Sequence, residues 1–130
     1  MKNYKELRVW QQGLRIVGFA YEVARQLPCE ETYGLRSQMT RAAISIPSNI
    51  AEGSSRTSEL EYKHFLEIAL GSCFELDTQL IAAIQLGFIE LPPDHPLPTL
   101  LEEEIKMLHG FISRLSSTSK AISQQLAANS

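Results

Sequence analysis

The sequence predicts an all-α protein, an antiparallel four-helix bundle with up-down-up-down topology. Apolar residues recur at alternating spacings of three and four through four segments, about residues 7–27, 30–53, 58–86 and 98–126. No segment alternates apolar and polar residues as a half-buried strand does. The connections are short apart from residues 88–98, and short connections place consecutive helices side by side in opposite directions. A chain of 130 residues suits a single domain, residues 1–130.

The first predicted helix covers about residues 7–27. Its apolar stripe at spacings of three and four consists of Trp10, Leu14, Val17, Tyr21 and Ala24. Pro28 ends the helix, because a proline disfavours helical geometry in the residue before it.

The second predicted helix covers about residues 30–53. Glu30 and Glu31 suit a helix N-terminus, and Gly53 is a natural stop. Its apolar stripe consists of Leu35, Met39, Ala42, Ile46 and Ile50. Pro47 lies inside this pattern, lacks a backbone N–H and crowds the preceding turn, so we expect one helix bent near residues 43–47. Two shorter helices are the alternative.

The third helix, about 58–86, has the clearest signals. Ser58 and Glu61 form a predicted capping box and Gly87 ends the helix. Between them run Tyr62, Leu66, Ala69, Cys73, Leu76, Leu80 and Ala83 at unbroken spacing.

The fourth helix follows residues 88–98, whose four prolines predict an extended connection. We expect the helix to begin near Pro98 or Thr99, where Thr99 and Glu102 offer a second capping box. Its stripe consists of Leu101, Ile105, Leu108, Ile112, Leu115, Ser119, Ile122 and Leu126.

Composition restricts the classes of function. The chain has 12 Lys and Arg against 15 Asp and Glu, a net charge of −3, which argues against a broadly basic nucleic-acid-binding protein. Any nucleic-acid site must therefore be a local patch. The N-terminal residues contain no uninterrupted apolar run, so we expect no signal peptide, no membrane segment and a cytoplasmic location. Cys29 and Cys73 match no metal-binding spacing and are expected to be free thiols.

A polar line on the second helix is the most unusual feature of the sequence. It consists of Gln38, Arg41, Ser45, Asn49 and Glu52, with Ser48 as an alternative member, and apolar residues flank it on both sides. A solvated helix face is one interpretation. A contact that fixes packing register or subunit arrangement is another, and anion binding through Arg41 is a third.

Residues 33–76 resemble the signature of the 23S rRNA intervening-sequence proteins, and the resemblance extends over most of the chain. The matching positions are Tyr33, Gly34, Leu35, Gln38, Arg41, Ala42, Ser45, Ile46, Asn49, Ile50, Ala51, Glu52, Gly53, Phe65, Ala69, Gly71, Ser72 and Glu75. The resemblance implies a four-helix bundle that assembles into a homopentameric ring. That fold is similar to the accessory variability proteins of diversity-generating retroelements, which bind nucleic acid and a reverse transcriptase.

RNA binding is the first functional hypothesis. Its candidate residues are Arg36, Arg41, Arg56 and Lys63, with Arg8, Arg15 and Arg25 of the first helix as further cations and Tyr33 and His64 for stacking. Scattered surface charge explains the same residues equally well. Fivefold repetition in a ring would make a modest patch multivalent. A structural or protein-interaction scaffold with no nucleic-acid role is the alternative function.

Enzyme and metal interpretations find little support in the sequence. Glu61 and His64 have the spacing of one di-iron ligand pair, but no second Glu-x-x-His exists. Ser45, His64 and Asp77 are the residue types of a hydrolytic triad, yet no nucleophile elbow surrounds Ser45. The sequence therefore predicts no catalytic residues, no metal, no cofactor and no small-molecule substrate.

Overall fold

The computed structural model describes residues 3–129, with the side chains of residues 117–120 outside the description. Its helices are α1 (Arg8–Ala24), α2 (Leu35–Ser54), α3 (Glu59–Gln85) and α4 (Pro96–Ala128), with short 3-10 turns η1 (Tyr4–Glu6) and η2 (Cys29–Glu31). Over residues 3–129 the structure contains these four α-helices and no strand, which confirms the all-α fold class.

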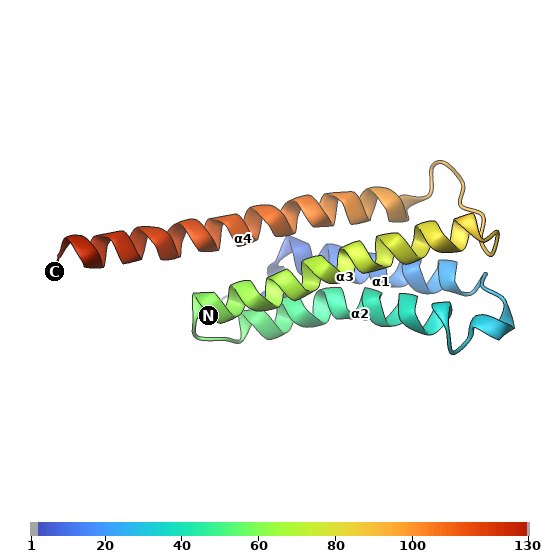
Figure 1. Ribbon diagram of the computed structural model, residues 1–130, viewed down its shortest axis with the longest axis horizontal. Helices are drawn as coiled ribbons and strands as arrows, with labels where there is room; N and C mark the ends of the chain where they lie inside the picture. The colour runs from blue at the N-terminus through green and yellow to red at the C-terminus, as the bar shows by residue number, and fades with distance from the viewer. Residues whose placement is uncertain (1–2, 130) are drawn as a thin grey trace.

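The helices form one bundle around one core. α2 packs against α1 and α3, and α4 packs against α3 and α1. Figure 1 shows the connection between α2 and α3 at one end of the molecule and the other two connections at the opposite end. Each helix supplies fully buried side chains to the core, among them Ile16, Met39, Ile46, Leu76 and Leu108.

The start of α2 differs from the prediction. Residues 29–31 form the separate 3-10 turn η2, and α2 begins at Leu35 rather than near residue 30. The Glu31 carboxylate accepts a hydrogen bond from the Leu35 backbone N–H at 3.1 Å, so it acts one turn before the helix. Glu31 thus serves the N-terminus of α2, and the intervening turn places that terminus five residues later than predicted.

α2 is one uninterrupted helix that contains Pro47 and ends at Ser54, one residue beyond the predicted stop. Gly53 is buried against α3. A Cβ at this position would lie 2.9 Å from both Phe65 Cβ and Tyr62 Cδ1. Gly53 therefore lets the last turn of α2 approach the first turns of α3.

The predicted Ser58 cap and Gly87 stop of α3 are confirmed. Ser58 is the N-cap, and its hydroxyl accepts a hydrogen bond from the Glu61 N–H at 3.2 Å. Gly87 follows the helix with a φ of 76°, a conformation that favours glycine. α4 begins earlier than expected, at Pro96, and its N-cap is His95, whose Nδ1 accepts from the Leu97 N–H at 3.2 Å. The prediction of Thr99 as the cap was wrong.

The buried face of α1 also differs from the prediction. Leu14 and Tyr21 of the expected stripe are 45% and 40% exposed. Of the other expected members, Ala24 is buried and Trp10 and Val17 are partly buried against the core. The neighbouring stripe, Val9, Ile16, Ala20 and Val23, supplies the fully packed face. Both stripes have helical spacing, so the sequence alone does not show which one is buried. The packing of α2 and α4 against α1 buries the stripe that contains Ile16.

The last helix is longer than the other three. α4 has 33 residues against 17 in α1, and at 1.5 Å per residue these lengths are about 50 Å and about 26 Å. Figure 1 shows the C-terminal part of α4 reaching past the end of the bundle. We call residues 116–128 the α4 tail. Its Ile122 and Leu126 are 53% and 65% exposed.

Candidate nucleic-acid interface and the groove at the bundle end

The polar line of α2 divides into a packed centre and exposed ends. The Ser45 and Ser72 hydroxyls lie 2.7 Å apart across α2 and α3. The Asn49 amide donates to Ser45 Oγ at 2.8 Å and to the Ser45 carbonyl at 2.9 Å. Gln38, Arg41 and Glu52 are exposed. The centre thus links two helices of the same chain. Ser45 and Asn49 are half-buried there, and the alternative member Ser48 is exposed.

The Arg36 side chain is hydrogen-bonded to the backbone at the end of α1 and just beyond it. Its Nε donates to the Ala24 carbonyl at 3.1 Å and its Nη2 to the Leu27 carbonyl at 2.6 Å. Ala24 is the last residue of α1 and Leu27 lies three residues beyond it. The Ala24 carbonyl also accepts from the Leu27 N–H at 3.1 Å, so Arg36 supplies its second donor. Arg36 therefore caps α1, and its guanidinium is directed toward the protein.

The other candidate cations lie apart from one another. Arg56 Nη2 is 2.6 Å from Glu52 Oε1, and its guanidinium lies over the Phe65 ring at 4.8 Å. Lys63 Nζ is 4.0 Å from Glu67. Arg41 is exposed midway along α2, and Arg36 and Arg56 lie at opposite ends of that helix, about 30 Å apart at 1.5 Å per residue. The structure does not gather the four predicted residues into one patch.

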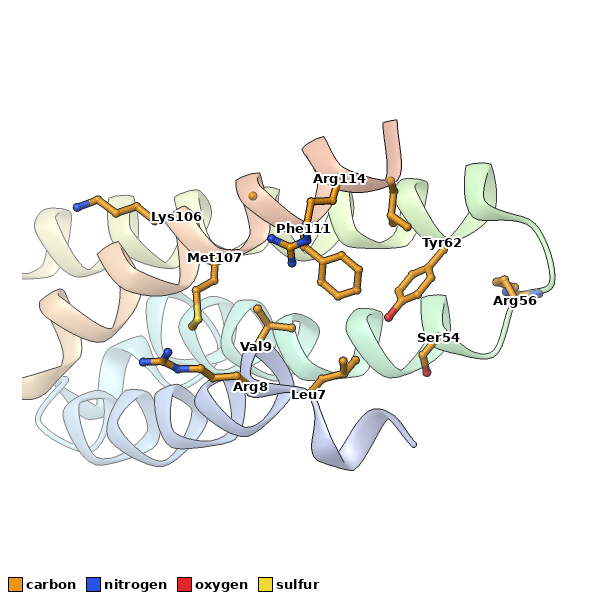
Figure 2. Close-up of a pocket in the computed structure, with 12 residues that line it drawn as sticks. Leu7, Arg8, Val9, Ser54, Arg56, Tyr62, Lys106, Met107, Phe111 and Arg114 are labelled. Carbon is orange, nitrogen blue, oxygen red and sulfur yellow. The ribbon is translucent and has the colours of Figure 1, made fainter. Parts of the chain in front are cut away.

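A groove of about 750 Å³ opens at the end of the bundle where α2 meets α3. Its apolar lining comes from the start of α1, from α3 and from α4, and consists of Leu7, Val9, Tyr62, Met107, Phe111 and Leu115. Figure 2 shows the Tyr62 and Phe111 rings directed into this hollow. Their centroids are 5.3 Å apart in an edge-to-face arrangement. Burial raises the pKa of the Tyr62 phenol.

Cations surround this groove. Arg8, Arg56, Lys106 and Arg114 contribute to its lining, and no carboxylate does. The Arg114 guanidinium lies 5.5 Å from the centre of the Phe111 ring, and Lys106 Nζ is 3.5 Å from Glu102. Glu52 and Glu102, which lie outside the lining, offset part of the charge of Arg56 and Lys106. The lining itself holds cations only, on a chain with a net charge of −3. Of the predicted RNA-binding residues, Arg56 belongs to this lining.

Sequence reasoning placed Arg8 among the further cations but missed Lys106 and Arg114. They belong to α4, which only the folded structure brings beside the start of α1. They are eight residues apart, about two turns along one helix, and neither stands in a recognisable basic run.

A buried carboxyl group lies in the core on α4. Glu104 is fully buried, and neither of its carboxyl oxygens has a hydrogen-bond partner. Burial raises its pKa from 4.5 to about 8. The nearby Gln12 side chain donates to the Leu100 carbonyl at 3.2 Å and to Glu103 at 3.4 Å. Cys73 lies close enough for the charge of Glu104 to raise the thiol pKa further, after the larger effect of burial.

The sequence contained a signal for Glu104 that was missed. Leu101, Glu104 and Leu108 have the three-then-four spacing of a buried stripe. The run Glu102 to Glu104 looks like a solvated acidic segment, and Ile105 offers an apolar alternative for the same stripe. Ile105 is only partly buried in the structure.

The residues considered above for metal binding and for catalysis do not come together in the structure as a metal-binding group. Over the described part of the chain, no group of three or more His, Cys, Asp and Glu side chains could hold a metal ion. Glu61, Lys63, His64 and Glu67 line a shallow depression on α3. Cys29 is exposed, Cys73 is buried, and both thiols are free. No helix within residues 3–129 is long and apolar enough to cross a membrane.

The chain matches one family of known proteins over most of its length. No curated protein matches the chain. The model of the family described as 23S rRNA-intervening sequence protein matches residues 5–110, which reach from η1 into α4 and include every residue of the polar line. The match covers most of the 130 residues and agrees with the four-helix architecture and with the resemblance found in residues 33–76. The chain therefore belongs to the 23S rRNA-intervening sequence protein family.

Proposed function

We propose that this protein is a non-catalytic, homo-oligomeric scaffold of the cytoplasm, a pentamer of up-down-up-down bundles bent at Pro47, with RNA or a nucleoprotein as its partner. The observation that carries the oligomer is the α4 tail. It reaches past the bundle and presents Ile122 and Leu126, each more than half exposed, in line with core residues of the same helix. An apolar helix stripe that leaves its own core is favourable when another protein surface covers it.

RNA binding is supported by the local positive charge. The groove region supplies Arg8, Arg56, Lys106 and Arg114 without a lining carboxylate, and Arg41 adds an exposed cation on α2. Phosphate contacts from arginine and lysine provide affinity that does not depend on sequence. Repetition of this modest set around a ring would strengthen binding through multivalency, even though each chain has a net charge of −3.

Two measurements on the purified protein test this function. Light scattering after nuclease treatment gives the mass, which we expect near five chains, and a single-chain mass would contradict the oligomer. Titration of a fluorescent structured RNA at increasing salt tests binding. We expect Arg56→Gln and Arg41→Gln each to reduce the steepness of the salt dependence by about one phosphate contact. Gln85→Ala, at an exposed uncharged residue at the other end of α3, is the control. Unchanged RNA mobility with excess protein at low salt would reject the RNA partner.

A protein-interaction scaffold without a nucleic-acid role is the second candidate. It is favoured by the internal contacts of the predicted RNA-binding cations: Arg36 caps α1, and Arg56 and Lys63 lie beside glutamates. The exposed Leu14 and Tyr21 of α1 provide an apolar surface for a protein partner. Retention of a partner after nuclease treatment, and its loss in Leu14→Ser with Tyr21→Ser, would support this function over the first.

A further inference from the structure

The groove occupies a position that a helix would fill. α1 begins only at Arg8, whereas α4 continues beyond Leu115 and α2 and α3 meet at residues 54–59. At this end of the bundle the apolar surfaces of α3 and α4 therefore lack the cover that α1 gives farther along. Tyr62, Met107 and Phe111 remain only partly buried around the hollow.

The buried stripe of α4 continues into the α4 tail. Leu101 and Leu108 are buried, Leu115 is partly buried in the groove lining, and Ile122 is 53% exposed, with seven residues between successive members. A seven-residue repeat keeps these side chains on one helix face. The face that packs on the core thus leaves the bundle beside the groove, and Leu126 extends it by one more turn.

We propose that the α4 tail of a second copy of this chain occupies the groove, so that the tail of each copy packs in the groove of the next. This inference rests on the proposed homo-oligomer and names its interface. The tail and the groove are different surfaces of one chain, and a contact between different surfaces is heterologous. Such contacts close into rings when the rotation between copies permits, as a pentamer requires.

The dimensions of the two surfaces are consistent with this contact. The tail has 13 residues and is about 20 Å long, and a groove of about 750 Å³ can take the side chains of one helix face. A helix about 10 Å wide that buries half its lateral surface over this length loses roughly 300 Å², and the groove loses a similar area. A single contact of about 600 Å² lies below the size of a stable pair, so assembly should be cooperative and favour the closed ring.

The end of the tail that carries its apolar stripe is uncharged. The tail has one charged residue, Lys120, and residues 121–128, which include Ile122 and Leu126, have none. These eight residues can therefore approach the groove cations without repulsion and without the cost of desolvating an ion. Lysines placed on the tail stripe should instead be repelled, whereas exposed positions elsewhere should tolerate them.

Substitution on both sides of the contact tests the proposal. In the tail, we would make Ile122→Lys with Leu126→Lys. The matched control is Ile81→Lys with Leu60→Lys on α3, where the side chains are 56% and 75% exposed. In the groove, we would make Gly110→Leu, because a Cβ there meets only the Arg114 guanidinium at 3.6 Å and the larger side chain would fill the hollow. Circular dichroism would show that every variant is folded.

We expect the tail and groove variants each to lower the light-scattering mass from the wild-type oligomer to one chain, and the control to keep the wild-type mass. An oligomer that survives both variants would overturn the tail contact while leaving the proposed function intact. A wild-type protein with the mass of one chain would overturn both. A photo-reactive residue at position 122 provides a second readout in the producing cells. Its adducts should map to the groove of another copy, and adducts on a different protein would overturn the assignment of the occupant.

Discussion

Glu104 makes the stability of this protein depend on pH in a way that one substitution isolates. The carboxyl is fully buried, and its pKa is about 8 instead of 4.5. Between these two values the folded chain holds a proton that the unfolded chain releases. Folding is therefore favoured at the acidic side of this window, and the free energy of unfolding falls as pH rises through it.

The magnitude follows from the two pKa values. One pKa unit corresponds to about 1.4 kcal/mol. The whole shift therefore lowers the free energy of unfolding by on the order of 5 kcal/mol once Glu104 is ionised above pH 8. Between about pH 5.5 and about pH 8 the linkage relation gives a loss of about 3 kcal/mol. The Glu104→Gln variant keeps the size of the side chain and does not titrate, so this component of the pH dependence should disappear.

Urea unfolding of wild type and Glu104→Gln at half-unit steps of pH is the assay. The quantity to follow is the free energy of unfolding of Glu104→Gln minus that of wild type. We expect it to rise by about 3 kcal/mol from about pH 5.5 to about pH 8. A constant effect of the amide on stability would not change this rise. Glu90→Gln, at an exposed glutamate in the loop before α4, should follow the wild-type curve. Parallel curves for wild type and Glu104→Gln would refute the reasoning, because they would mean that Glu104 titrates alike in both states.

Three further substitutions test local features by chemical denaturation. Arg36→Gln should cost about 1–3 kcal/mol, because the Leu27 carbonyl loses its side-chain donor and the Ala24 carbonyl keeps only the Leu27 N–H. Arg41→Gln should stay within about 0.5 kcal/mol, and equal effects would contradict the capping role. Gly53→Ala should cost about 1–3 kcal/mol, since its Cβ would lie 2.9 Å from Tyr62, and a stabilised variant would show that the helices separate easily. Gly71→Ala should stabilise by about 0.5–1 kcal/mol, because an exposed helical glycine with nothing within 4 Å gains helix propensity. A loss there would indicate a close neighbour in the assembly.

Local signals predicted most of the fold. Ser58 caps α3 and Gly87 ends it because each acts within a few residues of its own position. The stripe from Leu66 to Ala83 is buried as expected because helical spacing alone defines that face. The family resemblance in residues 33–76 was likewise contained in the order of the residues, and the family match confirms it.

Features that depend on packing were not predictable in the same way. Leu14 and Ile16 both belong to acceptable apolar stripes of α1, and only the contacts with other helices decide that Ile16 is buried. The groove joins Arg8 to Lys106, residues almost a hundred positions apart, so no window of sequence contains it. Arg36 looked like an accessible cation because its acceptors, the carbonyls of Ala24 and Leu27, become neighbours only after η2 reverses the chain.

Glu104 and Gly13 illustrate how the core accommodates a polar group. A Cβ on Gly13 would lie 3.3 Å from Glu104 Oε2, 3.4 Å from Ile46 and 3.4 Å from Pro47 Cβ. The absence of a side chain on α1 thus provides the room for a carboxyl from α4, beside the turn of α2 where Pro47 donates no hydrogen bond. An apolar residue at position 104 would bury the same volume without a charge, so stability does not explain a carboxyl there. A buried polar group restricts how helices can register against one another, because a shifted arrangement would lose this fitted space. Glu104 with Gly13 is therefore best understood as a device that fixes the packing of α1, α2 and α4, at a cost in stability that rises with pH.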